Sequence, residues 1–271
     1  MFGNSANEKN ALWTNGNWLK SRFHFSFAEY RNPKNTQFGV LRVMNDDLVQ
    51  GNRGFGTHPH RDVEIVTYIV EGELTHADST GTRETLGRGS VQYMTAGTGI
   101  RHSEHNLQDC PLRFVQIWIT PASYGLEPTY GGFDGTTVAA QAGRKNALAQ
   151  LVGDRRQPSG GRPACEAPVR ISQDCAMFVS ELDVGAAVEF PLRAGRQAYL
   201  LCLEGTLSAG GVGGAPLRLA RHDAVEWRGE GTLRLAAEDG APAHLLLMEM
   251  AEGVGGRAQQ GAAKGRWPLH V

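Results

Sequence analysis

The sequence has few cysteines, no long apolar run and almost no net charge. Each of these absences excludes a class of protein. The 271 residues include four cysteines, Cys110, Cys165, Cys175 and Cys202. They are widely spaced and form no CxxC pair, so the sequence argues against a disulfide framework and against a zinc finger. The spacing suits a reducing compartment.

Targeting, membrane and nucleic-acid signals are also missing. No stretch approaches the ~20 apolar residues that a membrane-spanning helix needs, and Met1–Trp13 is polar without an apolar core of signal-peptide length. The 27 basic and 28 acidic residues nearly cancel, which gives no general attraction to nucleic acid or to an anionic membrane. We therefore expect a cytoplasmic protein that binds neither directly.

Glycine, by contrast, is abundant: 35 residues fall at regular intervals between short β-rich runs. Evenly spaced short strands with glycine turns are typical of an all-β sandwich or barrel. Phe38–Asn45 is one such predicted strand, and the polar run Asn45-Asp46-Asp47 predicts a turn that ends it.

The chain reads as two similar halves. A Gly-, Pro- and Tyr-rich stretch over 122–134 predicts a linker, and the strand pattern then resumes, with Tyr199–Gly205 similar in character to Tyr68–Gly72. We predict a first domain over 1–134, a second over 135–251 and a Gly- and Ala-rich tail over 252–271.

Two short motifs in the first half carry the chemistry, His58-Pro59-His60 and His102-Ser103-Glu104. Side chains at i and i+2 leave the same face of a β-strand, so each motif presents two metal-binding groups together. One histidine alone would more often be a polar residue at a barrel rim, but two facing pairs would bring three imidazoles and one carboxylate to one ion. The second half has no HxH and no HxE, which predicts a single metal site.

Several residues near the two motifs have more than one plausible role. Pro59 cannot donate to a sheet, so it predicts a strand start or an edge strand. Glu64 shares the parity of His58 and His60, and it either orients a ligand histidine or has a structural role. His76 and His105 are expected to be ordinary core or surface histidines, and His105 has the wrong parity to join Glu104.

At these residues the sequence resembles the pirin family, a branch of the two-domain cupins. The runs that carry the resemblance are His58–Gly72 and Met94–Glu104, with Phe23–Ala28 and Phe38–Val43 upstream. The resemblance implies a bicupin, two jelly-roll β-barrels in tandem, with His58, His60, His102 and Glu104 as the metal ligands. The general cupin pattern would nominate Glu64 as the carboxylate, but Glu104 shares a strand face with His102 and is preferred.

The resemblance also implies an activity, because bacterial pirin-like proteins are associated with quercetin 2,3-dioxygenase. The expected substrates are a flavonol-like aromatic and dioxygen, with Glu104 acting as both ligand and catalytic base. Imidazoles and a carboxylate with open positions suit Fe(2+), the expected ion, and Mn, Co, Ni, Cu and Zn are alternatives. Two other functions stay open: a non-enzymatic, metal-binding regulator that acts through a protein partner, and a cupin with another small-molecule substrate.

Overall fold

The structure, a computed structural model, describes residues 10–155, 166–211, 215–238 and 240–253. Most of the predicted tail over 252–271 and Cys165 lie outside these residues. The chain forms two compact units. We call Asn10–Thr136 with Ile171–Gln173 the N-terminal unit, and the described parts of Thr137–Arg170 and Asp174–Glu252 the C-terminal unit.

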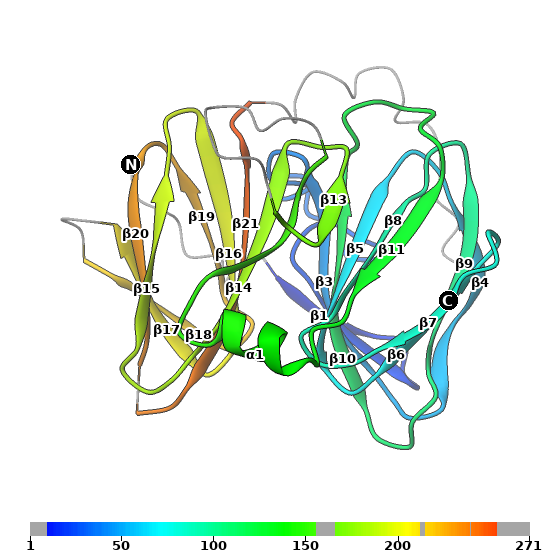
Figure 1. The fold of residues 1–271 in the computed structure, drawn as a ribbon, viewed down its shortest axis with the longest axis horizontal. Coiled ribbons are helices and arrows are strands. Elements are labelled where there is room, and N and C mark those ends of the chain that lie inside the picture. Colours follow the sequence, from blue (N-terminus) through cyan, green and yellow to red (C-terminus); the bar gives the residue numbers. More distant parts are fainter. Residues whose placement is uncertain (1–9, 156–165, 212–214, 239, 254–271) are drawn as a thin grey trace. The chain divides into compact units, whose positions relative to one another are not determined.

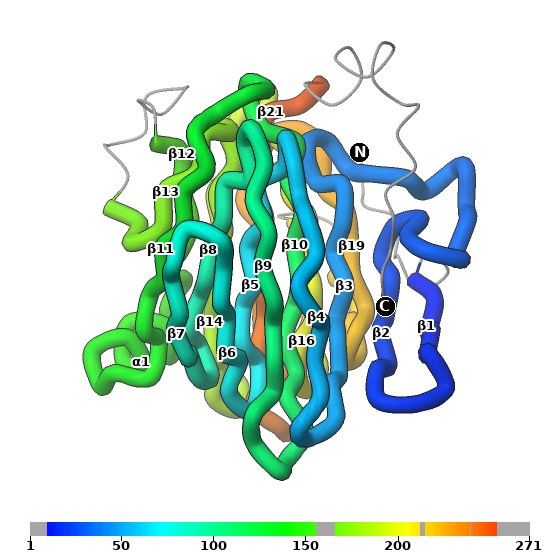
Figure 2. Tube along the Cα trace, turned by 90° about the vertical axis from the view of Figure 1, so that its right-hand side faces the viewer, coloured from blue at the N-terminus to red at the C-terminus, as the bar shows by residue number. Residues whose placement is uncertain are grey.

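The N-terminal unit consists of two facing antiparallel sheets (Figure 1). The larger sheet has the order β1-β2-β3-β10-β5-β8-β11 and the smaller the order β4-β9-β6-β7. Figure 2 shows the smaller sheet in front of β3, β10, β5 and β8. The strands are β1 Ala11–Thr14, β2 Leu19–Phe23, β3 Leu41–Val49, β4 Arg53–His60, β5 Glu64–Glu71, β6 Leu74–Asp78, β7 Arg83–Leu86, β8 Val91–Thr95, β9 Ile100–Asn106, β10 Leu112–Ile119 and β11 Thr129–Phe133.

The C-terminal unit repeats this arrangement with a sheet of order β13-β12-β14-β21-β16-β19 and a sheet of order β15-β20-β17-β18. Its core consists of aliphatic and aromatic side chains, among them Phe190, Leu200 and Leu245. Its elements are α1 Val138–Arg144, β12 Ala149–Asp154, β13 Val169–Ile171, β14 Cys175–Leu182, β15 Ala187–Leu192, β16 Arg196–Glu204, β17 Thr206–Gly211, β18 Leu217–Ala220, β19 Ala224–Arg228, β20 Gly231–Ala237 and β21 Ala243–Ala251. The predicted all-β architecture of two jelly-roll units is confirmed.

Strand β9 presents His102 and Glu104 on its buried face. Its residues alternate between buried and more exposed positions, with Ile100, His102, Glu104 and Asn106 buried. An alternation of period two means that one face of the strand points into the sandwich and the other points outward. An apolar cluster that includes Leu74, Leu112 and Phe114 packs between the sheets.

Two local predictions are wrong in ways that matter for the site. Asn45, Asp46 and Asp47 form no turn; they lie in the middle of β3, paired with both β2 and β10, and all three are buried. Within the predicted linker, Thr129–Phe133 forms β11 and pairs with β8. In both places, sheet pairing with distant segments overrides the local preference for a turn. Pro59, in contrast, lies on the edge strand β4 as predicted. No described helix has the length and apolar character to cross a membrane.

Candidate metal centre

The register between β4 and β9 brings the two motifs together. His58 lies directly opposite His102, and His60 lies opposite Ile100. Directly opposed residues in an antiparallel pair project from the same face of the sheet, here toward the interior. A bulge between Phe55 and His58 shifts the register just before the first motif.

The three imidazoles form one compact group. One nitrogen from each of His58, His60 and His102 lies within 4.8 Å of the other two. The ring centroids are 4.8 Å apart for His58 and His60, 4.5 Å for His58 and His102, and 4.9 Å for His60 and His102. Among the described residues, this is the group of histidine, cysteine and acidic side chains with a geometry suited to an ion.

The free nitrogens of the group fit a metal ion. Nδ1 of His58 donates to the carbonyl oxygen of Gly56 at 2.8 Å, which leaves its Nε2 lone pair available. Nδ1 of His60 and Nε2 of His102 are buried and have no hydrogen-bond partner. Burial, with a contribution from His58, lowers the pKa of His60 to about 3, and burial lowers the pKa of His102 well below its ordinary value. Burial also lowers the pKa of His58, so all three rings favour the neutral form that metal ligation requires.

Glu104 points from the same face of β9, but its carboxylate is held by the larger sheet. Oε1 accepts from Nε2 of Gln92 at 2.7 Å and from Oγ1 of Thr67 at 3.4 Å, and Oε2 accepts from Nε2 of Gln116 at 2.8 Å. Burial raises the pKa of Glu104 to about 7, and the hydrogen bonds partly oppose this shift. Trp118 orients Gln116 by donating to its Oε1 at 3.1 Å. Glu104 is not among the three clustered side chains, so its ligation of the ion stays a prediction.

Glu64 anchors a distant segment of the N-terminal unit. Its fully buried carboxylate accepts from the backbone N–H of Ser172 at 2.6 Å, the backbone N–H of Gln173 at 3.1 Å and the hydroxyl of Thr95 at 3.3 Å. Burial raises the pKa of Glu64, and these hydrogen bonds oppose the rise. Of the two roles left open by the sequence, these contacts favour the structural one.

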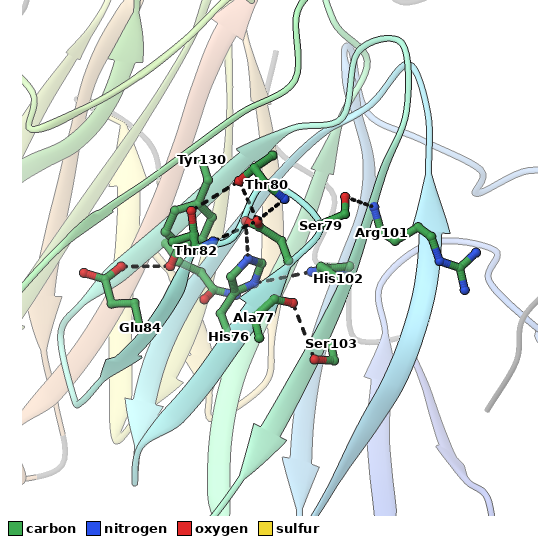
Figure 3. Close-up of polar contacts among 12 residues, drawn as sticks. His76, Ala77, Ser79, Thr80, Thr82, Glu84, Arg101, His102, Ser103 and Tyr130 are labelled. Carbon is green, nitrogen blue, oxygen red and sulfur yellow. Dashed lines mark hydrogen bonds and ion pairs between the residues drawn. The ribbon is translucent and has the colours of Figure 1, made fainter.

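His76 is the residue of the site that the sequence reasoning missed. Its Nδ1 lies 3.4 Å from Nδ1 of His102 (Figure 3). Its Nε2 lies 3.0 Å from Oδ2 of Asp78. The ring stacks on Tyr130 with centroids 4.3 Å apart, and Tyr130 in turn donates to Glu84 at 2.8 Å. A signal was present, because His76 and Asp78 share the i, i+2 spacing of the two recognised motifs. His105, by comparison, lies on the outward face of β9, as its parity predicted.

A cavity of about 440 Å³ opens beside the histidines. Its wall includes one member of the group, His60, together with two exposed arginines, Arg61 and Arg101. The other lining residues are Pro59, Ser79, Gly99 and Ile100. The ring of Trp118 packs edge-on against His60, with centroids 5.0 Å apart. His60 is the one member of the three-histidine group among these lining residues, and its side chain is buried.

The sequence is similar to two protein families and to several bacterial proteins. Residues 6–119 match the family described as Pirin, and residues 162–250 match the family described as quercetinase C-terminal cupin domain. A Pseudomonas aeruginosa protein, named provisionally as a quercetin 2,3-dioxygenase, is 39% identical over 237 residues, which cover 88% of this chain and 94% of that protein. A protein of Escherichia coli K12 named quercetin 2,3-dioxygenase is 48% identical over 131 residues, 48% of this chain and 56% of that protein.

Solved structures agree with the fold. The crystal structure of YhhW from Escherichia coli matches with a TM-score of 0.76 at 30% identity, covering 92% of this chain and 97% of that one. A second structure, described as the bacterial pirin YhhW in complex with nickel(II), matches with a TM-score of 0.75 at 29% identity over 92% and 98% of the two chains. The bicupin architecture expected from the sequence is thus confirmed.

Proposed function

Because the chain belongs to the pirin family, we propose that it is a metal-dependent dioxygenase of the quercetinase type, which cleaves a flavonol-like aromatic with dioxygen. The observation that carries this proposal is the group of three imidazoles with nitrogens within 4.8 Å of one another. Relatives named quercetin 2,3-dioxygenase support the reaction type.

The proposed ligands are His58, His60, His102 and Glu104, and the proposed ion is Fe(2+). Three imidazoles and a carboxylate also suit Mn, Co, Ni and Cu, and a related pirin was crystallised with nickel(II). When bound, such an ion supplies Lewis acidity that lowers the pKa of a coordinated hydroxyl and makes the ring more reactive toward dioxygen.

Glu104 is the proposed proton acceptor for the substrate hydroxyl. Its carboxylate is buried on the inward face of β9, the face that also carries His102, and a general base has to lie within reach of the proton that it accepts. Gln92, Gln116 and Thr67 hold both carboxylate oxygens, which fixes the direction from which a proton is accepted. These neutral donors keep the carboxylate oriented without cancelling its charge.

The cavity beside His60 is the proposed binding site for the aromatic substrate. Its volume of about 440 Å³ falls within the range of about 300–1,000 Å³ typical of small-molecule sites. Pro59 and Ile100 supply apolar wall, while Arg61 and Arg101 supply donors for substrate oxygens. Such a mixture of apolar surface and few polar groups suits a polyhydroxylated aromatic compound.

Oxygen uptake with quercetin tests the proposal. The full chain is stripped of metal, reloaded separately with Fe(2+), Mn, Co, Ni, Cu or Zn, and assayed beside His60→Ala and Glu104→Ala. His105→Ala is the matched control, because His105 lies on the same strand but faces outward. We expect uptake in at least one metal form, loss of at least a hundredfold in both site variants and no change in the control. Uptake that persists unchanged in both variants contradicts the assignment, and metal binding without uptake favours the regulator.

A further inference from the structure

We propose that His76 and Asp78 are positioning residues of the metal centre, which fix the protonated nitrogen of His102 so that its Nε2 lone pair faces the three-histidine group. The inference rests on the proposed metal site but not on the proposed reaction. It is carried by a chain of contacts from Asp78 Oδ2 to His76 Nε2 at 3.0 Å and from His76 Nδ1 to His102 Nδ1 at 3.4 Å.

The direction of these hydrogen bonds starts from Asp78. Its Oδ1 accepts from the backbone N–H of Thr80 at 2.8 Å, from the hydroxyl of Thr80 at 2.5 Å and from the backbone N–H of Thr82 at 3.3 Å. A carboxylate with so many donors is an acceptor. Its other oxygen, Oδ2, therefore accepts from His76, and Nε2 of His76 carries the proton.

The protons on the two histidines follow from this assignment. A neutral imidazole with its proton on Nε2 has a lone pair on Nδ1, so Nδ1 of His76 is an acceptor. The facing Nδ1 of His102 must then be the donor, which leaves the lone pair of His102 on Nε2. That nitrogen is the buried atom without a hydrogen-bond partner. In many metal sites a carboxylate accepts a hydrogen bond from the ligand histidine itself. Here a second histidine, His76, lies between the carboxylate of Asp78 and the ligand His102.

The orientation of His76 is fixed by its surroundings. Its side chain is buried, as is that of Asp78. The ring stacks on Tyr130 at an interplanar angle of 19°, and the register of β6 places His76 between Glu84 on β7 and Glu104 on β9. The hydroxyl of Tyr130 is engaged with Glu84. Sheet pairing and stacking therefore hold the ring plane, and Asp78 selects which nitrogen carries the proton.

The decisive variant is Asp78→Asn, which keeps the shape but changes the proton order. The new amide oxygen can still accept from Thr80 and Thr82, so the turn is retained. The amide nitrogen now donates to Nε2 of His76 and moves the His76 proton to Nδ1. His102 must then accept on Nδ1 and carry its own proton on Nε2, where a metal has to bind.

Two further variants separate positioning from packing. His76→Leu removes the acceptor for the Nδ1 proton of His102, whereas His76→Asn offers an amide oxygen close to the position of the original Nδ1. Glu84→Gln is the matched control, because Glu84 bonds to Tyr130 but lies outside the chain of contacts to His102. All variants are compared with the full wild-type chain, and thermal unfolding confirms that each is folded.

Two readouts are used, the dissociation constant for nickel(II) by competition with a chromophoric chelator and the ring ¹⁵N–¹H spectrum of the metal-free protein. We expect His102 to carry its proton on Nδ1 in the wild type and on Nε2 in Asp78→Asn. Nickel(II) should bind about 10- to 100-fold more weakly to Asp78→Asn and His76→Leu, less so to His76→Asn, and unchanged to Glu84→Gln. A wild-type proton on Nε2, or unchanged affinity in Asp78→Asn, overturns the inference. Failure of quercetin oxidation leaves both readouts intact.

Discussion

The buried carboxyl group of Asp47 makes the stability of the N-terminal unit depend on pH. It lies on β3, only 4% exposed, opposite Ser21 on β2 and Phe114 on β10. Burial raises the pKa of its carboxyl to about 8; Ser21 opposes this shift, and the charges of Asp46 and Glu104 add to it. The folded protein therefore keeps a proton on Asp47 at neutral pH.

The sign of the effect on stability follows from this shift. Between the ordinary pKa of 3.8 and the folded value of about 8, the folded state holds a proton that the unfolded state has lost. The free energy of unfolding then decreases as the pH rises through this window. One such proton corresponds to ~3 kcal/mol between pH 5 and pH 7.

Replacing Asp47 by Asn removes the titration and keeps the shape. Urea unfolding of chelator-treated protein at pH 5, 6 and 7 should show that Asp47→Asn gains ~3 kcal/mol of stability relative to the wild type across this range. Asp109→Asn, the same change at an exposed position, is the matched control. A stability difference between Asp47→Asn and wild type that stays constant from pH 5 to pH 7 would show that Asp47 is not protonated in the folded state.

Two further predictions concern the contacts that support the site. Glu64→Ala leaves two backbone N–H groups without their acceptor and should lower the free energy of unfolding by about 2–5 kcal/mol, whereas Glu64→Gln keeps one acceptor oxygen and should lose less; equal losses in urea unfolding would contradict this. Gly97→Ala should cost about 2–4 kcal/mol, because Gly97 has φ +47° and a Cβ atom there would overlap the carbonyl of Leu126. Gly81→Ala, at φ +93° with open space around it, should cost about 1–2 kcal/mol from backbone strain alone, and comparable thermal shifts in the two glycine variants would argue against the steric explanation.

The strand faces of the candidate metal site could be predicted from the sequence alone. Side chains alternate with a period of two in any strand, so His58 pairs with His60 and His102 with Glu104 wherever the strands lie. The edge position of Pro59 was equally local, because a proline without an N–H fits poorly inside a sheet. The second half, which lacks either motif, was correctly expected to repeat the fold, since repeated strand patterns need no metal ligands.

Which strands pair with one another depends on long-range contacts, and the local sequence does not specify these. Asn45–Asp47 has the local chemistry of a turn, yet β2 and β10 pair with it on both sides and bury it in a sheet. His76 looked ordinary because its role depends on the register of β6 against β9, which sets it beside His102 across 26 residues of chain. The preference of a few residues is worth about 1 kcal/mol or less each, and pairing between distant strands readily outweighs it. The spacing of residues along one strand therefore determines which side chains share a face. Pairing between distant strands determines which residues those side chains contact.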